Sequence, residues 1–233
     1  MQNVEQSIFS GADELAQVVA GAWLDEVAAA HRAGRGHCVA LSGGRITQKF
    51  FAAVVALSRA RGMSLAGVHF FWADERGVPP KDAESNFRMA DELLFQPLRI
   101  AAENVHRIRG ELPPAAAAEL AVRDLSAVTA QLDLVFLGMG EDGHVASLFP
   151  GEAAAERANP AVFRAVTNSP KPPPNRVTLG YPAIAAARQV WVLASGAGKE
   201  AALRESLATP GETPLARVLR GRSNTRLFTD IRL

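Results

Sequence analysis

Apolar residues recur along the chain at two spacings, one typical of helices and one of buried strands. Between Ala12 and Arg32 they recur every three or four positions, whereas His37–Leu41 is a short, mostly apolar run. The same alternation continues downstream. Further strands are predicted at Val68–Ala73, Leu132–Leu137 and Gln189–Ala194, and further helices at Gln48–Arg61, Ser85–Phe95, Pro114–Ala130, Tyr181–Ala187 and Lys199–Leu207.

This order of elements predicts an α/β fold, a three-layer sandwich with a mainly parallel, Rossmann-like sheet flanked by helices. Crossover helices gather the loops that follow parallel strands at one sheet edge, where ligands bind in open α/β sheets. The proline-dense stretch Pro170–Pro174 is too short for an interdomain linker and indicates a rigid, extended segment. We therefore expect residues 1–233 to form one domain.

Composition narrows the class of protein. The 233 residues are 48% hydrophobic and 21% charged, as in ordinary globular proteins, and a net charge of +1 offers no broad basic surface for nucleic acid. The single cysteine, Cys38, excludes an internal disulfide and favours a reducing, cytoplasmic setting. The N-terminus lacks a signal-peptide pattern, and no apolar stretch is long enough to span a membrane. A monomer and a small homo-oligomer both fit the sequence.

The most informative segment runs from Leu132 to Gly151, LDLVFLGMGEDGHVASLFPG. An apolar strand ends in a glycine-rich turn that holds Glu141, Asp142 and His144, at the edge where ligands bind. Histidine is the side chain best matched to accepting a proton near neutral pH. Both a proton-transfer site and a charged surface turn with an incidental histidine fit this segment alone.

A second glycine-rich turn, Ser42-Gly43-Gly44, lies between a strand and a helix. Glycines let backbone N–H groups approach an anion, and a helix N-terminus adds partial positive charge, so the turn can cradle a phosphate. It lacks the spacing of nucleotide-binding loops, and a plain strand-to-helix turn also explains the glycines. Arg45, directly after them, favours the anion site.

Two further segments carry charged side chains. Asp74, Glu75 and Arg76 follow an apolar strand and can hold a hydroxylated, anionic substrate or form a surface ion cluster, and Ser85 indicates a helix start. The segment from SPKPPPNRVTLG to SGAGKEAAL supplies the cations Lys171, Arg176 and Lys199. Of these, Lys199 can neutralise a phosphate as a point charge.

Together these segments resemble the 6-phosphogluconolactonase family, across Leu41 to Leu207. The matching signatures are LSGG, DERxVPxxxxESNFRMA, LGMGEDGHVASLFPG and SPKPPPNRVTL, followed by GxGK. The resemblance implies hydrolysis of 6-phospho-D-glucono-1,5-lactone to 6-phosphogluconate in the pentose phosphate pathway, with no metal or cofactor. The related glucosamine-6-phosphate deaminases typically carry DEY at Asp74-Glu75-Arg76 and an Asn-Glu pair at Ser147-Leu148-Phe149, so both positions favour the lactonase.

The resemblance also implies residue roles. His144 looks like the general base that activates water, with Asp142 orienting its imidazole and Glu141 a solvated neighbour. Asp74 and Glu75 complete the expected catalytic set by positioning substrate hydroxyls and an arginine. The residues expected to bind phosphate and sugar are Ser42, Gly43, Gly44, Arg45, Arg76, Arg176 and Lys199.

The chain departs from the family at Arg45-Ile46-Thr47, where many relatives have Ser-Thr-Pro. The change removes hydroxyl donors to phosphate, and Arg45 either replaces them by charge or points away. Two alternatives to a lactonase stay open: a glucosamine-6-phosphate isomerase/deaminase, and a non-catalytic sugar-phosphate sensor of the kind fused to DNA-binding domains. The chain shows no helix-turn-helix segment or basic patch, which disfavours the sensor.

Overall fold

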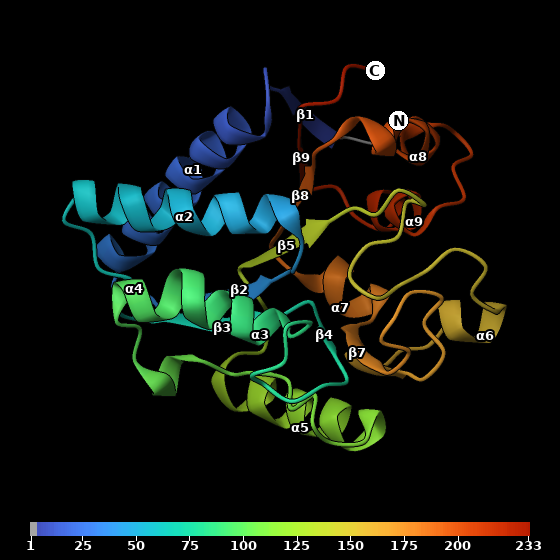
Figure 1. Cartoon of the computed structure of the whole chain (residues 1–233), viewed down its shortest axis with the longest axis horizontal. Helices are drawn as coiled ribbons and strands as arrows, with labels where there is room; N and C mark the ends of the chain where they lie inside the picture. The colour runs from blue at the N-terminus through green and yellow to red at the C-terminus, as the bar shows by residue number, and fades with distance from the viewer. Residues whose placement is uncertain (1–3) are drawn as a thin grey trace.

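The computed structural model describes residues 4–233 and is built on a six-stranded parallel sheet (Figure 1). Residues 1–3 lie outside the described residues. The predictions of a single domain over 1–233 and of no signal peptide both include these three residues. The strand order is β1-β9-β8-β5-β2-β3, and every pairing is parallel. The strands are β1 (Val4–Ile8), β2 (His37–Leu41), β3 (Val68–Trp72), β5 (Leu134–Gly138), β8 (Gln189–Ala194) and β9 (Thr225–Thr229).

Helices flank this sheet, which confirms the predicted α/β class. Helix α1 (Ala12–Arg32) begins and ends where its apolar spacing predicted, and it packs against α2 (Arg45–Ala60). The other helices are α3 (Asn86–Ala90), α4 (Gln96–Leu98), α5 (Pro114–Val128), α6 (Ala154–Arg157), α7 (Tyr181–Ala186), α8 (Glu200–Leu207) and α9 (Pro214–Arg220), with a π-helical turn at Asp91–Phe95 and 3₁₀ turns at Ala102–Asn104 and Ala197–Lys199. None of the helices in the described residues is both long and apolar enough to cross a bilayer.

Aromatic side chains fill the space between α1, α2 and the sheet. The Trp23 indole lies against the rings of Phe50 and Phe136, with centroids 5.8 and 6.0 Å away, and Trp191 packs against Phe136 at 5.7 Å. All four residues are at most 4% exposed. Burying aromatic rings in this way contributes much of the stability of a core, so the sheet is a rigid base for the loops at its edge.

A smaller antiparallel sheet, which the sequence did not predict, extends the fold beyond β3. Its strands are β4 (Asp74–Arg76), β7 (Arg176–Leu179) and β6 (Phe163–Val166), and α5 packs against the latter two. β4 follows β3 after one residue, and its register pairs Asp74 with Thr178 and Arg76 with Arg176. The pairing brings two charged segments, distant in sequence, to the same place.

Two helices differ from their predictions, one in where it starts and the other in its conformation after the first turn. Helix α2 starts at Arg45 rather than Gln48, because Gly44 takes the position before the helix with φ at +104° and Thr47 lies inside it, donating its hydroxyl hydrogen bond to the Gly43 carbonyl. The predicted helix 85–95 starts as expected, with the Ser85 side chain accepting from the Arg88 N–H, but passes into the π-helical turn at Asp91.

The direction of the chain connections reverses between β2 and β5. From β2 the chain crosses to β3 on one side, whereas β5, β8 and β9 lie on the other. In open α/β sheets such a switch point leaves a crevice between the loops at the carboxyl ends of the strands. The loops after β2 and β5 are the two glycine-rich turns, 42–44 and 138–144, so the fold places both at this crevice.

Candidate active site

A cavity of about 130 Å³ opens at the carboxyl ends of β2 and β5. It receives residues from the loops after β2, β5 and β8 and from the smaller sheet, and it contains every predicted site residue except Asp142 and Glu75. Its lining residues are Ser42, Gly43, Gly44, Arg45, Ile46, Asp74, Arg76, Gly138, Met139, Gly140, His144, Ala146, Arg176 and Lys199.

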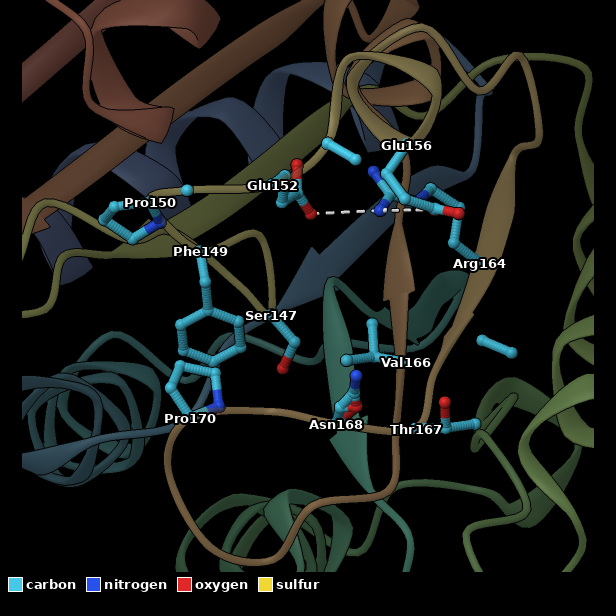
Figure 2. A pocket seen from close by; sticks show the side chains of 13 residues that line it. Ser147, Phe149, Pro150, Glu152, Glu156, Arg164, Val166, Thr167, Asn168 and Pro170 are labelled. Carbon is cyan, nitrogen blue, oxygen red and sulfur yellow. Dashed lines mark hydrogen bonds and ion pairs between the residues drawn. The ribbon is translucent and has the colours of Figure 1, made fainter.

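A larger cavity, of about 500 Å³, lies behind Ser147 and Phe149, beside the ion pair of Arg164 and Glu152 (Figure 2). None of the predicted site residues lines it. We take the smaller cavity as the candidate active site because of the side chains that line it, although its volume is smaller. Only the smaller one combines a histidine, a helix N-terminus and unpaired cations.

The histidine of the cavity is paired with the carboxylate expected to orient it. His144 Nδ1 lies 2.5 Å from Asp142 Oδ1, and the turn that carries both is closed by a bond from the Gly140 N–H to the His144 carbonyl. With Nδ1 engaged by an acceptor, the proton belongs on Nδ1, and Nε2 keeps its lone pair. Nε2 has no partner among residues 4–233, and the ring lines the cavity.

Packing positions the His144 ring, and its surroundings set its pKa. Phe149 packs against it with centroids 4.8 Å apart, and Gly140 leaves it room, because a Cβ there would lie 2.0 Å from Nδ1. Burial lowers the pKa of His144 below its ordinary value, and the positive charge of Lys171 acts in the same direction while Asp142 opposes it. The imidazole is therefore neutral near pH 7 and can accept a proton.

The opposite end of the cavity is positively charged. Arg45 and Lys199 line it beside the first turn of α2, and neither side chain has a hydrogen-bond or ion-pair partner in the described part of the chain. Burial, and next the charge of Arg45, lower the pKa of Lys199, which lines the same cavity as Arg45. Unpaired cations that repel one another beside a helix N-terminus favour a bound anion.

The glycines of the 42–44 turn leave space for this anion to reach the backbone. Gly44 has φ at +104°, and a Cβ on Gly43 would lie 2.0 Å from Asn86 Oδ1. Side chains are excluded from both positions, so the backbone lies open to the cavity. Ser42 does not offer its hydroxyl freely, because the Ser42 Oγ–H donates to the Phe136 carbonyl at 2.8 Å.

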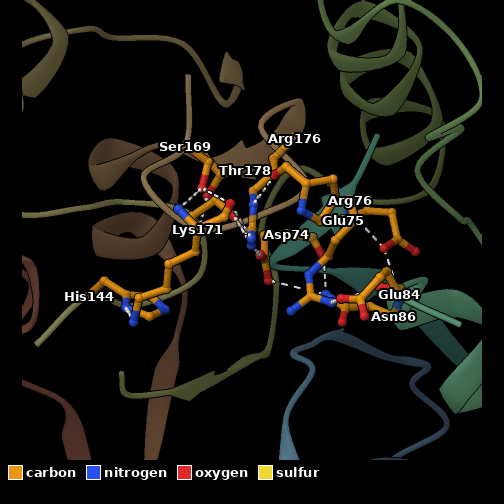
Figure 3. A network of polar contacts seen from close by, with 12 residues as sticks. Asp74, Glu75, Arg76, Glu84, Asn86, His144, Ser169, Lys171, Arg176 and Thr178 are labelled. Atoms are coloured by element: carbon orange, nitrogen blue, oxygen red, sulfur yellow. Dashed lines mark hydrogen bonds and ion pairs between the residues drawn. The ribbon is translucent and has the colours of Figure 1, made fainter. Parts of the chain in front are cut away.

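A buried polar network forms the third wall (Figure 3). The Ser147 hydroxyl donates to Asp74 Oδ2 at 2.6 Å, Arg176 Nη1 lies 3.4 Å from Ser147 Oγ and 4.0 Å from Asp74 Oδ2, and the Asn86 amide reaches the Asp74 carbonyl at 2.9 Å. Asp74 and Arg176 are each 4% exposed. This wall therefore presents a fixed carboxylate and a fixed guanidinium to the cavity.

Arg176 has a second role that the sequence did not indicate. Its Nε and Nη2 donate to the backbone carbonyls of Lys171, Pro172 and Pro173, at distances of 2.9 to 3.1 Å. The guanidinium thus holds the proline-rich segment in place as well as lining the cavity. Burial lowers the pKa of Arg176 from its ordinary value, and the Asp74 charge opposes this shift.

The structure does not bring Glu75 to the cavity, where the sequence had placed it among catalytic residues. Its carboxylate accepts from the backbone N–H groups of Arg76, Asn86 and Phe87 at 2.7 to 2.8 Å, and from the Ser85 hydroxyl at 3.1 Å. Burial raises the pKa of Glu75. With these donors around it, the carboxylate fixes the loop between β4 and α3.

Of the predicted residues Arg76 and Asp142, only Arg76 lines the cavity. Arg76 lines the cavity and is anchored to the 84 loop, with Nη1 donating to the Glu84 carbonyl at 2.7 Å. Asp142 contacts the ring of His144 rather than the cavity. Burial opposes its ionisation, but the bond with His144 and the charge of Lys171 outweigh burial and lower its pKa.

Sequence reasoning missed Ser147 and Ala146. Ala146 adopts φ at +50°, which is unusual for a residue with a side chain, and this turn directs Ser147 toward Asp74. The polar residue within the apolar run VASLF was the signal available in the sequence. Within residues 4–233, no three His, Cys, Asp or Glu side chains gather as ligands for a metal ion.

A family model described as "Glucosamine-6-phosphate isomerases/6-phosphogluconolactonase" matches residues 10–227. The chain belongs to this family. Among its curated relatives is the 6-phosphogluconolactonase of Mycobacterium tuberculosis, which is 38% identical over 186 residues, 74% of each chain. Another is the 6-phosphogluconolactonase of Aggregatibacter actinomycetemcomitans, 34% identical over 197 residues that cover 82% of this chain and 84% of the relative.

Solved structures of family members share the fold. The 6-phosphogluconolactonase of Thermotoga maritima aligns with a TM-score of 0.85 at 28% identity, covering 97% of this chain and 99% of the other. The Trypanosoma brucei 6-phosphogluconolactonase aligns at 0.83, also with 28% identity, over 97% and 95%. A monomeric glucosamine-6-phosphate deaminase aligns at 0.84 with 18% identity, over 97% of each chain, and so shares the fold alone.

Proposed function

We propose that this protein hydrolyses 6-phospho-D-glucono-1,5-lactone to 6-phosphogluconate, as a carboxylic ester hydrolase of the pentose phosphate pathway. The observation that carries the proposal is the polarity of the cavity. One end holds a neutral histidine with a free Nε2, and the other holds two unpaired cations at a helix N-terminus. A phosphorylated lactone presents a carbonyl and a phosphate at opposite ends of one small molecule.

In the proposed reaction His144 Nε2 accepts a proton from water as the water oxygen attacks the lactone carbonyl carbon. The resulting tetrahedral oxyanion is stabilised by positive groups that line the cavity, of which Arg76 and Arg176 are the candidates. The bond from the carbonyl carbon to the ring oxygen then breaks, and the ring oxygen receives the proton from His144. The products are a carboxylic acid and a hydroxyl, so atoms and charge balance without a metal or an organic cofactor.

Asp142 keeps the imidazole in the reactive tautomer by accepting from Nδ1–H, and it stabilises the imidazolium that forms in the first step. Asp74, fixed by Ser147 and Asn86, is suited to accept hydrogen bonds from sugar hydroxyls. Arg45, Lys199 and the backbone of Gly43 and Gly44 bind the phosphate. Binding energy from the phosphate, which does not react, orients the carbonyl against the water.

The small-molecule partner is therefore a phosphosugar lactone, and both sheets serve the same site. The β4 and β7 residues Asp74 and Arg176 line a cavity whose other walls come from the large sheet. The buried apolar cluster is also shared, since Val177 and Leu179 of β7 belong to it together with β2 and β5. We infer from this that the chain acts as one domain.

The related activity on the same fold is deamination of glucosamine 6-phosphate. The chain carries Arg76 and the Ser147-Leu148-Phe149 run where the resemblance to deaminases would require other residues. Behind the wall of the cavity, the Ser147 hydroxyl donates to Asp74. This arrangement supports the lactonase.

A rapid assay on freshly generated 6-phosphogluconolactone, corrected for spontaneous hydrolysis, tests the proposal. We expect enzyme-dependent acid release from the lactone and no ammonia from glucosamine 6-phosphate. Ammonia release without lactone turnover would assign the protein to the deaminases. Tight binding of 6-phosphogluconate with no turnover of either substrate would assign it to non-catalytic sugar-phosphate sensors.

A further inference from the structure

Lys171 lies at the back of the histidine and carboxylate pair. Its Nζ is 3.4 Å from Asp142 Oδ1 and 3.4 Å from His144 Nδ1, the two atoms that share the short hydrogen bond (Figure 3). Lys171 does not line the cavity, whereas His144 does. Its charge therefore acts on the side of the ring opposite to the nitrogen that would accept a proton.

The segment that carries Lys171 is built to hold this position. The Ser169 side chain bonds both the N–H and the carbonyl of Lys171, at 3.2 and 2.8 Å. Arg176 donates to the same carbonyl and to the next two, and residues 172–174 are all proline. A chain fixed by so many bonds and by proline rings loses little further freedom when it delivers the ammonium to the pair.

Burial has the largest influence on the pKa of His144 and disfavours imidazolium, whereas the carboxylates around the ring favour it. The groups that act on the ring are Asp142 from its own turn, Asp74 from β4 and Lys171 from the proline-rich segment. Two of these three are carboxylates, and an imidazolium cannot accept a proton from water. A single cation at 3.4 Å from both Asp142 and the ring opposes them.

We propose that Lys171 is a positioning residue that, together with burial of the ring, keeps His144 unprotonated and its Nε2 available, by neutralising the Asp142 carboxylate from behind. The inference rests on the proposed function for the role of the base, but not for the electrostatic effect itself. It makes Lys171 part of the catalytic apparatus without any contact with substrate.

The test replaces Lys171 with Met, which keeps the length and removes the charge. NMR titration of the imidazole Cε1–H signals, with His144 assigned by the loss of its signal in His144→Gln, reports the ionisation directly. We expect the His144 pKa to rise by about 0.5–1 unit, since the ammonium is partly exposed and screened. Lys171→Arg should restore the wild-type value.

Kinetics give the matching readout. Removing the cation makes His144 easier to protonate, so the acid limb of the kcat/KM profile should move to higher pH by the same amount. At pH values on that limb the variant should be about three- to tenfold slower, and the two enzymes should converge on the alkaline plateau. Lys49→Met is the matched control, because its side chain is 47% exposed against 44% for Lys171 and it pairs with Asp13 far from the ring.

Three results would overturn the inference. One is a His144 pKa that does not move in Lys171→Met, and another is a uniform loss of kcat at all pH values, which marks a structural role. The third is a raised KM with an unshifted profile, which marks a direct contact with substrate. Because the NMR titration needs no turnover, absence of lactonase activity would refute the proposed function while leaving this inference to be decided.

Discussion

The two ends of the cavity differ in how their side chains are satisfied. At the His144 end each group has a partner in the protein: the ring has Asp142, the carboxylate has Lys171, and Phe149 covers one face. At the α2 end Arg45 and Lys199 have none within the described residues. Paired groups hold their geometry before the substrate arrives, whereas unpaired cations gain their partner only when an anion binds.

The difference separates two contributions to catalysis. Changes at the His144 end should lower kcat and act equally on phosphorylated and unphosphorylated lactones. Changes at the α2 end should raise KM for the phosphorylated lactone alone. Each of the following variants tests whether the two ends are as independent as the structure indicates, and their effects decrease in the order given.

Removing the base itself should have the largest effect. His144→Ala leaves Asp142 and the cavity walls in place, so kcat should fall by at least ~10² on both lactones, the low end of what loss of a general base costs. The Ki of 6-phosphogluconate should stay close to that of the wild type. Turnover near the wild-type level in the corrected assay would exclude His144 from the mechanism.

Gly140→Ala should disturb the pair without removing either member. The added Cβ would lie 2.0 Å from His144 Nδ1 and 2.6 Å from Asp142 Oδ1, so the ring must move away from its position. A displacement of this kind lowers kcat by about 10- to 100-fold. Gly11→Ala is the control, because a Cβ there meets nothing within 4 Å. Equal activity of the two variants would show that the ring position is not critical.

Lys199→Ala should affect affinity. Loss of a charge-assisted hydrogen bond to phosphate costs about 1.5–3 kcal/mol, so KM for the phosphorylated lactone should rise at least about tenfold while kcat changes little. Hydrolysis of unphosphorylated gluconolactone should be unchanged, which measures the selectivity of the effect. If both substrates lose equally, Lys199 contributes to the reaction or to the fold rather than to the phosphate.

The parts of this site that could be predicted from the sequence are those that follow apolar strands. The 42–44 turn, Asp74, His144 and Lys199 all lie in segments that follow strands of the large sheet, and the rule that loops meet at one edge was sufficient to bring them together. The large sheet was predictable for the same reason. β2, β5 and β8 are buried along nearly their whole length and are accordingly apolar in sequence.

The smaller sheet could not be predicted, although Asp74 and Arg176, the two side chains it brings to the third wall of the cavity, were expected site residues. β4 is the charged tripeptide Asp74–Arg76, and no apolar pattern marks it. Its strand geometry comes from pairing with β7, a contact between residues about a hundred positions apart. Tertiary context decides such strands, because intrinsic strand preference is weak. β1 and β9 were missed as well, although they pair along their full length at the sheet edge.

Roles of charged residues within the site were equally hidden. Glu75 is adjacent to Asp74 in sequence, but alternation along β4 directs it away from the cavity to the backbone of α3. Lys171 was visible only as a cation in a proline-rich segment, and Arg176 was expected to bind the substrate but not to hold that segment. Their contacts with Asp142 and with the carbonyls of residues 171–173 depend on the fold of that segment.

Arg45 carries the smallest and most informative expected effect. It lines the cavity together with Lys199, but the residue is exposed, so its attraction for phosphate is screened by solvent. Arg45→Ala should therefore raise the Ki of 6-phosphogluconate by about two- to threefold, and the difference should shrink between ionic strengths of about 0.05 and 0.5 M. Arg45→Ser tests whether a hydroxyl donor at the α2 N-terminus recovers the loss without a charge.

The neighbouring Ile46 is not suited to replacement by the Thr that many relatives carry, because Ile46 is only 6% exposed and Thr would lose apolar packing. Two outcomes for Arg45→Ala would be decisive. An unchanged Ki at low salt would leave the phosphate to Lys199 and the backbone, with Arg45 directed to solvent. A tenfold or larger rise would place Arg45 in direct contact with the phosphate. Arg45 and Lys199 would then contribute equally to phosphate affinity, rather than Lys199 contributing most of it.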